Sequence, residues 1–122
     1  MAQHNDFGKL AEVKAAEFLQ KKGYKILNRN WRFQKLEIDI IAHDLEKDQI
    51  VIVEVKARKD STIQPAEDAV NKTKRKMLVT AAHEYIVSHS IEKETRFDIV
   101  SVYKPQNQWV FRHIPNAFLA MD

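Results

Sequence analysis

The stretch of sequence that decides the fold runs from Leu36 to Arg58 and reads LEIDIIAHDLEKDQIVIVEVKAR. Its first part, Leu36–Ala42, alternates between two faces, whereas Ile50–Ala57 begins with four consecutive β-branched residues. Alternation is typical of a half-buried strand, and a β-branched run is typical of a strand covered on both faces. The mostly polar segment His43–Gln49 between them is short, so we expect these two strands to pair antiparallel.

Further strands are expected on both sides of this pair. One covers Tyr24–Phe33, and two more cover Phe97–Tyr103 and Trp109–Ile114, on either side of a turn at Pro105–Asn107. Strands that follow each other in sequence usually pair with each other. The first three strands should therefore form an antiparallel meander.

Two helices complete the pattern. The first runs from about Phe7 to Lys22, and Gly23 supplies the left-handed residue that ends it. The second falls between Pro65 and Ser88: Pro65 suits the first helical position, but the stretch before Asn71 could instead be a loop, with Asn71 as the N-cap. The expected apolar stripes are Phe7, Leu10, Ala11, Ala15, Phe18 and Leu19 in the first helix, and Val70, Met77, Leu78, Ala81, Ala82, Tyr85 and Ile86 in the second.

The element order α-β-β-β-α-β-β predicts an α/β fold with a mixed β-sheet flanked by helices. The chain has 122 residues with only 2 glycines and 3 prolines, and it contains no repeat and no linker-like segment. We therefore expect a single domain over residues 1–122.

Composition narrows the classes of protein that remain. The absence of cysteine excludes disulfides, thiolate zinc sites and cysteine nucleophiles. No apolar run approaches the ~20 residues that span a bilayer, and the first six residues, MAQHND, do not resemble a signal peptide. We expect a soluble cytoplasmic protein that does not bind membranes. Its net charge of +3 permits a nucleic-acid partner without indicating one.

Acidic and basic side chains gather at the end of the central strand. One face of that strand begins with two isoleucines and continues through Glu54 and Lys56 to Arg58. A tight turn would place Asp39 of the preceding strand opposite about Val53. A longer turn or a bulge would bring Asp39 level with Glu54.

Carboxylates that converge on one face of a sheet repel each other unless a positive charge lies among them. A divalent cation fits, because Mg²⁺ prefers one or two carboxylates together with water and phosphate oxygens. A lysine two residues from such a ligand can stabilise an attacking hydroxide or the charge on a phosphate. The structural alternative is an ordinary surface ion pair between Glu54 and Lys56.

Six ordered motifs extend this pattern over most of the chain. They are Gly8–Ala15, Gly23-Tyr24, Asn30-Trp31-Arg32, Glu37–Ala42, Val53–Arg58 and Arg96-Phe97-Asp98. Together they resemble the YraN family, a bacterial, endonuclease-like family within the PD-(D/E)xK nuclease superfamily, similar to archaeal Holliday-junction resolvases. The resemblance runs from about Asn5 to Tyr103 and implies a restriction-endonuclease-like fold.

The resemblance also implies an activity and a site. The protein would be a metal-dependent, endonuclease-like hydrolase of DNA phosphodiester bonds, acting on branched or damaged structures. Asp39 and Glu54 would hold Mg²⁺ or Mn²⁺, Lys56 would assist the nucleophilic water, and Glu12 on the first helix would complete the catalytic set. Because related resolvases are symmetric dimers, the resemblance also implies a homodimer.

Two residues depart from the family pattern. Ala11 replaces the second glycine of the segment Gly-x-x-Gly-Glu-x-x-Ala, and Leu36 stands where the family usually has a glycine. At each of these positions, the larger side chain leaves less space for a backbone to approach the site. The alternative function is therefore a nucleic-acid-binding module that keeps the nuclease fold but does not cut.

Two basic clusters are candidates for phosphate contacts. They comprise Arg58 and Lys59 after the central strand, and Lys72, Lys74 and Lys76 on the second helix. A solvated helix face is the alternative for the second cluster. Trp31 and Trp109 are isolated in the sequence, without the aromatic–basic interleaving that binds single strands.

Three further residues have structural readings. Glu12 could pair with a neighbouring lysine. Asp98 is expected to be a buried acid that pairs with an arginine or caps backbone amides. His83 is expected to pack near the second apolar stripe.

Overall fold

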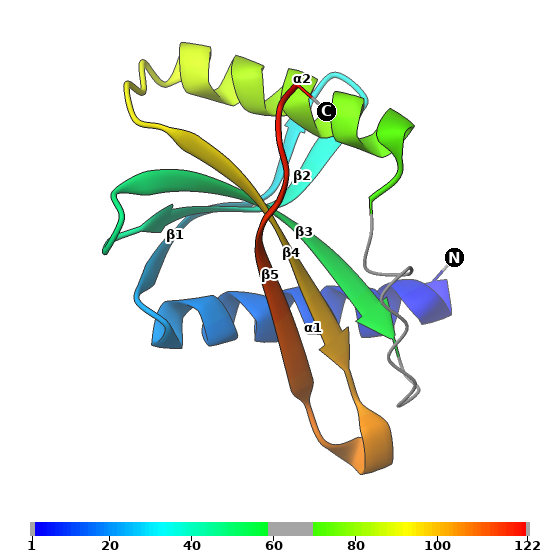
Figure 1. Ribbon diagram of the computed structural model, residues 1–122. Coiled ribbons are helices and arrows are strands. Elements are labelled where there is room, and N and C mark those ends of the chain that lie inside the picture. Colours follow the sequence, from blue (N-terminus) through cyan, green and yellow to red (C-terminus); the bar gives the residue numbers. More distant parts are fainter. Residues whose placement is uncertain (1, 59–69, 122) are drawn as a thin grey trace.

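The computed structural model describes residues 2–58 and 70–121 (Figure 1). Its elements are α1 (Ala2–Lys21), β1 (Tyr24–Phe33), β2 (Leu36–Asp44), β3 (Gln49–Arg58), α2 (Lys72–Ser88), β4 (Thr95–Tyr103), a short 3₁₀ turn η2 (Pro105–Asn107) and β5 (Val110–Phe118). This order confirms the expected succession α-β-β-β-α-β-β. Lys59 and Pro65, which the sequence singles out, lie outside the described residues.

The five strands form one mixed sheet in the order β1-β2-β3-β4-β5. The first three strands are antiparallel neighbours, which confirms the meander. β3 and β4 are parallel, and β5 returns antiparallel to β4. A parallel neighbour requires a crossover, and α2 lies in that connection.

The turn between β2 and β3 decides which residues meet. Asp44 pairs with Gln49, so the turn spans residues 45–48, and the ladder continues to the pair Ile40–Val53. One step further along this register, Asp39 is level with Glu54. The longer of the two turns compatible with the sequence is therefore the one that forms.

The two helices lie on opposite sides of the sheet (Figure 1). α1 packs through Ala11, Ala15 and Leu19 on the face that carries Val51 and Val53. On the other face, α2 buries an apolar stripe against β-strand residues; its buried members are Leu78, Ala81, Ala82 and Tyr85. Neither described helix has the length and apolar character needed to cross a membrane.

The helix ends and stripes differ from the expected ones in detail. α1 begins at Ala2, before the expected start near Phe7. α2 begins after Asn71, whose side chain accepts a hydrogen bond of 2.8 Å from the backbone N–H of Lys74, so the N-cap alternative is confirmed. Leu10 and Met77 are exposed, as is His83, for which the expected packing is wrong. Each of them is next in sequence to a buried residue (Ala11, Leu78 and Ala82), and successive residues of a helix point about 100° apart around its axis.

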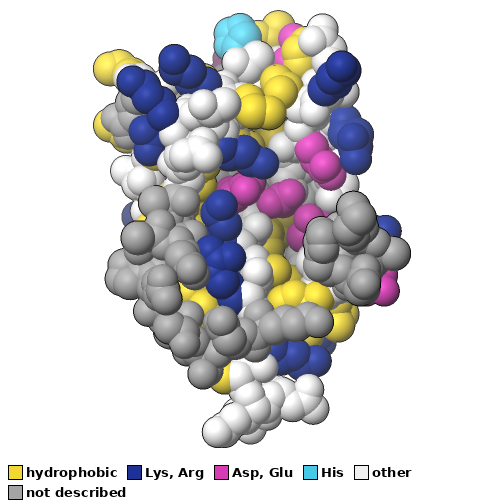
Figure 2. Space-filling model, turned by 90° about the vertical axis from the view of Figure 1, so that its right-hand side faces the viewer, with side chains coloured by type: hydrophobic (Ala, Val, Ile, Leu, Met, Phe, Trp, Pro, Cys, Tyr) yellow, Lys and Arg dark blue, Asp and Glu magenta, His cyan; other side chains and the backbone are white. Residues whose placement is uncertain are grey.

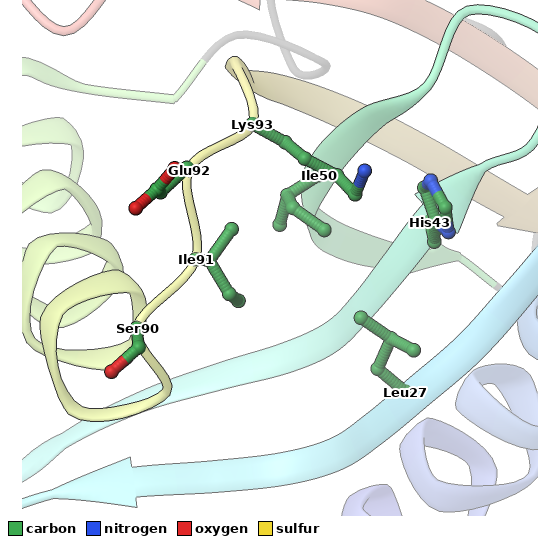
Figure 3. A pocket seen from close by; sticks show the side chains of 7 residues that line it. All are labelled: Leu27, His43, Ile50, Ser90, Ile91, Glu92 and Lys93. Carbon is green, nitrogen blue, oxygen red and sulfur yellow. The ribbon is translucent and has the colours of Figure 1, made fainter.

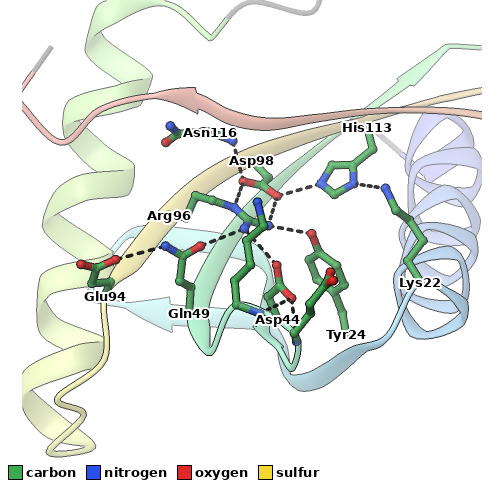
Figure 4. Close-up of polar contacts among 11 residues, drawn as sticks. Lys22, Tyr24, Asp44, Gln49, Glu94, Arg96, Asp98, His113 and Asn116 are labelled. Atoms are coloured by element: carbon green, nitrogen blue, oxygen red, sulfur yellow. Dashed lines mark hydrogen bonds and ion pairs between the residues drawn. The ribbon is translucent and has the colours of Figure 1, made fainter.

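A buried polar cluster joins β1, β2, β4 and β5 (Figure 4). Arg96 donates two hydrogen bonds to Asp98, of 2.9 and 3.0 Å, one of 3.0 Å to Asp44 and one of 2.6 Å to the Tyr24 hydroxyl. His113 Nε2 lies 2.7 Å from Asp98 Oδ2. The backbone N–H of residue 116 donates a further bond of 2.9 Å to Asp98. Asp98 is thus the arginine-paired, amide-capping acid that the sequence predicts.

Candidate active site

Asp39 and Glu54 meet where β2 leaves β3. The backbone hydrogen-bond ladder between these strands ends at the pair Ile40–Val53. Beyond it, the side chain of Asp39 accepts the hydrogen bond that a strand backbone would otherwise accept. Its Oδ2 accepts a hydrogen bond of 2.8 Å from the backbone N–H of Val55. The negative charge of Asp39 acts on the carboxyl group of Glu54, and Glu54 acts in turn on Asp39. Neighbouring carboxyl groups that repel each other are harder to ionise together.

Glu54 is the most confined of the acids at this site. It is 7% exposed, and its Oε1 is buried without a hydrogen-bond partner among the described residues. Its Oε2 lies 3.6 Å from Lys74 Nζ, which reaches over from the first turn of α2. Burial, and then the negative charge of Asp39, raise the pKa of Glu54 to about 7, against the opposing charges of Lys74 and Lys56. Burial also raises the pKa of Asp39.

Glu12 approaches the same acids from α1. It is half-buried, and burial followed by the charges of Asp39 and Glu37 raises its pKa to about 7. With its amide nitrogen facing the acids, Asn30 donates a hydrogen bond of 2.8 Å to Glu12 Oε1 and one of 3.0 Å to Glu37 Oε2. The structure therefore brings α1, β1 and β2 together around a group of acids.

Three residues at this site escaped the sequence reasoning in whole or in part. Asn30 and Glu37 lie inside quoted motifs, but only the fold shows that Asn30 ties Glu12 to Glu37. Asn30 has a positive φ of 54°, a conformation that asparagine tolerates better than most residues. Lys74 was expected to contact phosphate, and here it contacts Glu54.

The basic candidates spread around the acids and do not form one cluster. Lys56 and Arg58 are half-buried at the end of β3, whereas Lys72 and Lys76 are exposed on the first turns of α2. Figure 2 shows acidic side chains gathered near the middle of one face of the molecule, with basic side chains alongside them. An anionic ligand that approached the acids would therefore meet flanking positive charge.

The surface has one hollow beside the acids and another away from them. A polar hollow of about 260 Å³ opens beside Glu12, and its lining is Gly8, Lys9, Glu12, Asn30, Arg32 and Glu37. A cavity of about 460 Å³ lies elsewhere, between β1, β2 and the loop after α2, lined by Leu27, His43, Ile50, Ser90, Ile91, Glu92 and Lys93 (Figure 3). None of the residues predicted for the site lines that cavity.

The donor set at Asp39 and Glu54 fits a hard divalent cation. The buried Oε1 of Glu54 has no hydrogen-bond partner in the described part of the chain, and a cation would offset the repulsion between the two carboxyl groups. In the described part of the chain, no group of three or more His, Cys, Asp or Glu side chains is arranged to hold a metal ion. The pair would therefore rely on water and substrate oxygens for its other ligands, as Mg²⁺ sites commonly do.

Comparison with known proteins adds the family. A model described as "Uncharacterised protein family UPF0102" matches residues 11–102, a span that contains every described candidate from Glu12 to Lys76. The chain belongs to UPF0102. This confirms the resemblance to the YraN family, and the mixed sheet with two helices matches the nuclease-like α/β fold that the resemblance implies.

UPF0102 relatives cover the chain almost completely. UPF0102 protein FP2501 of Flavobacterium psychrophilum is 48% identical over 97% of this chain and 98% of its own. A UPF0102 protein of Parabacteroides distasonis is 38% identical over 98% of each chain. Among solved structures, SfsA of Pyrococcus furiosus in complex with Ca²⁺ matches with a TM-score of 0.46 and 10% identity. That match covers 92% of this chain and 65% of SfsA, so this chain spans less than two thirds of SfsA.

Proposed function

We propose that this member of UPF0102 is a metal-dependent endonuclease that hydrolyses DNA phosphodiester bonds. The observation that carries the proposal is the meeting of Asp39 and Glu54: the two carboxyl groups repel each other, and the buried Oε1 of Glu54 has no hydrogen-bond partner among the described residues. Such an arrangement costs stability, and strongly perturbed acids of this kind are concentrated at functional sites.

Asp39 and Glu54 would hold Mg²⁺ or Mn²⁺. When bound, the ion would polarise the scissile phosphate and lower the pKa of a coordinated water. The pair offers only carboxylate oxygens, one of which, the buried Oε1 of Glu54, has no hydrogen-bond partner among residues 2–58 and 70–121, and Mg²⁺ and Mn²⁺ prefer such oxygen ligands.

Lys56 and Glu12 supply the remaining chemistry in this proposal. Lys56 follows Glu54 by two residues on the same face, so its ammonium can stabilise negative charge on the phosphate and position the attacking water. Glu12, with a pKa of about 7, changes its protonation state near neutral pH. An acid of this kind is suited to accept or deliver a proton during hydrolysis.

The basic residues around the site support DNA as the substrate. Arg58, Lys72 and Lys76 would contact phosphates and position the duplex without reading its sequence, together with Lys59 and with Lys74 once it leaves Glu54. Branched or damaged DNA and a homodimeric assembly enter the proposal from the family resemblance, because a four-way junction presents two equivalent strands to cut.

One observation favours the alternative of a non-cleaving nucleic-acid-binding module. Lys74 Nζ lies 3.6 Å from Glu54 Oε2 and offsets part of the negative charge that a metal ion would neutralise. In such a module, Lys74 would remain paired with Glu54 and the site would bind DNA through its surrounding basic residues.

A cleavage assay separates the two functions. The wild-type protein and the Glu54→Gln and Asp39→Asn variants would be incubated with labelled linear, nicked, forked and four-way DNA, with Mg²⁺, Mn²⁺ or a chelator. We expect cleavage that needs the metal and that falls at least about 100-fold in both variants. Asp48→Asn, which changes an exposed acid in the β2–β3 turn, is the matched control.

Binding without cleavage by the wild-type protein would contradict the nuclease and establish the alternative. Cleavage that survives in a clean Asp39→Asn preparation would contradict the assigned site.

A further inference from the structure

Aromatic and basic side chains that are distant in sequence come together between α1 and β5. Phe7 stacks on Trp109, with ring centroids 5.8 Å apart and planes within 11°. Phe18 stacks on Phe111 at 4.7 Å and 12°. All four rings are half-buried, so each retains contact with solvent. Trp109 is isolated in the sequence, but in the fold it belongs to a row of aromatic side chains.

Lysines lie directly against these rings. Lys104 Nζ is 4.6 Å from the centroid of the Trp109 ring, and Lys14 Nζ is 6.0 Å from it. Cation–π attraction holds an ammonium group near an indole at such distances. We refer to the set Phe7, Phe18, Trp109, Phe111, Lys14 and Lys104 as the aromatic–lysine strip.

A shallow hollow of about 190 Å³ opens within the aromatic–lysine strip. Its walls include Phe18, Trp109 and Phe111, and Lys14 and Lys21 lie at its edge. One acid is present: Glu17 also lines the hollow, and its Oε1 lies 3.7 Å from Lys14 Nζ. With Lys104 included, the three lysines outnumber this acid and the local charge is positive.

The strip lies close to the proposed active site but is distinct from it. Glu12 faces β1 and β2 from one flank of α1, whereas Lys14 and Phe18 face β5 from the other. The two sites therefore lie on different flanks of α1. The sheet also connects them, because Arg58 at the end of β3 pairs with Tyr103 of β4, which pairs with Val110 of β5.

We propose that the aromatic–lysine strip binds an unpaired DNA strand that leaves the duplex held at the acids. The aromatic rings would stack on bases, which expose their faces only when unpaired, and the lysines would contact the phosphates between them. The proposal rests on the proposed function for the identity of the substrate as DNA and for the duplex held at the acids. It names that substrate class more closely, as a duplex with a single-stranded arm.

Trp31 provides an internal contrast. Its ring packs edge-to-face on Tyr85, 5.2 Å away, beneath α2. Tyr85 in turn donates a hydrogen bond of 2.7 Å to Asn28, which ties this pair to the sheet. Trp31 therefore belongs to the packed interior side of α2 and should not respond to a strand bound at β5.

Tryptophan fluorescence tests the proposal directly. The Trp31→Phe variant retains Trp109 as its single tryptophan, and Trp109→Phe retains Trp31. Both would be titrated with an oligo(dT) strand in chelator, so that no cleavage takes place. We expect saturable quenching in Trp31→Phe and none in Trp109→Phe.

Binding measurements then assign the contacts. Trp109→Ala should weaken oligo(dT) binding about 5- to 150-fold, the range expected for one base stacked on an aromatic ring. Lys104→Gln should reduce the slope of log K against log salt by about 0.7. Lys47→Gln, which removes an exposed lysine of the β2–β3 turn, is the matched control and should leave ring stacking unaffected. Duplex binding should be insensitive to Trp109→Ala.

Several outcomes would overturn the strip proposal. They are the absence of Trp109 quenching, equal losses with Lys47→Gln and Lys104→Gln, or a monomer–dimer equilibrium that Trp109→Ala abolishes without any change in oligo(dT) binding. The last result would make the strip a contact between two copies of the chain. A protein that cuts duplex DNA but ignores oligo(dT) contradicts only this inference. A protein that binds oligo(dT) through Trp109 but never cuts contradicts only the proposed function.

Discussion

Two groups of acidic side chains in this molecule are shielded from solvent. They differ in how fully hydrogen-bond donors and positive charges compensate them. In the group around Asp98, carboxylate oxygens receive hydrogen bonds from Arg96, from His113 and from a backbone N–H. In the group around Glu54, the charge of Asp39 repels that of Glu54, and one buried oxygen of Glu54 has no hydrogen-bond partner among the described residues.

The pKa values follow this difference. Burial pushes the pKa of Asp98 upward, but the hydrogen bonds from His113 and Arg96 outweigh burial and hold it below its usual value. At Glu54, burial is reinforced by the charge of Asp39, and Lys74 and Lys56 do not compensate, so its pKa rises to about 7. The fold thus supplies enough hydrogen bonds to keep Asp98 ionised, whereas the positive charges near Glu54 do not offset its burial.

This difference separates acids with a structural role from acids with a ligand-binding role. A paired and hydrogen-bonded acid such as Asp98 fastens strands together, and its removal leaves Arg96 with less charge compensation. An acid that is only partly compensated, such as Glu54 beside Lys74, weakens the fold unless a ligand supplies the missing charge. We therefore read the Asp98 group as structural and the Glu54 group as the ligand-binding one.

The largest effect on stability is expected from Asp98→Asn. This change removes the charge that faces Arg96 and disturbs the bond to His113, so it should lower the free energy of unfolding by about 3–5 kcal/mol. Urea unfolding monitored by circular dichroism would measure the loss. Asp48→Asn, whose carboxylate is exposed and pairs with Lys93, should leave the urea midpoint nearly unchanged. Equal midpoints for the two variants would remove the structural role of the Asp98 group.

A smaller effect of opposite sign is expected from Glu54→Gln. In the folded protein Glu54 keeps its proton up to about pH 7, whereas an unfolded glutamate releases it near pH 4.5. Between these values the folded state binds more protons, so the wild-type free energy of unfolding should fall as the pH rises. Glutamine does not titrate, and the variant should gain about 1–3 kcal/mol relative to wild type by the upper end of this window.

Urea midpoints measured in chelator across this pH window would check the prediction for Glu54. The stabilising contribution of the Asp98 group should instead change at acidic pH. An acid with a lowered pKa loses that contribution as the pH falls below 3.8, the ordinary pKa of an aspartate. A constant difference between Glu54→Gln and wild type at every pH would contradict the raised pKa of Glu54.

Local patterns in the sequence were sufficient for the elements and the element order. The alternation of Leu36–Ala42 and the β-branched run that begins at Ile50 specify neighbouring strands, and the arginine-paired role of Asp98 also followed from its motif. The register was less certain, because two turn lengths were compatible with the polar segment after β2. In the structure it is the longer turn, over residues 45–48, and not a bulge, that brings Asp39 level with Glu54.

Contacts between distant residues could not be read from spacing. Phe7 and Trp109 are 102 positions apart, and their stacking depends on where α1 crosses β5, which no local pattern encodes. Asn30 is a second example, because its bonds to Glu12 and Glu37 require α1, β1 and β2 to converge. Lys74 is a third, since its contact with Glu54 depends on the docking of the first turn of α2.

Isothermal titration of Mn²⁺ into the DNA-free protein, slightly above neutral pH, tests most directly whether the partly compensated acids serve a cation. The wild-type protein should bind the ion with release of the proton that Glu54 partly retains near its raised pKa of about 7, visible as a binding heat that depends on the buffer's heat of ionisation. Glu54→Gln should lose this binding, and Asp48→Asn should retain it. Mn²⁺ binding of equal strength in wild type and Glu54→Gln, or no binding by either, would contradict the account.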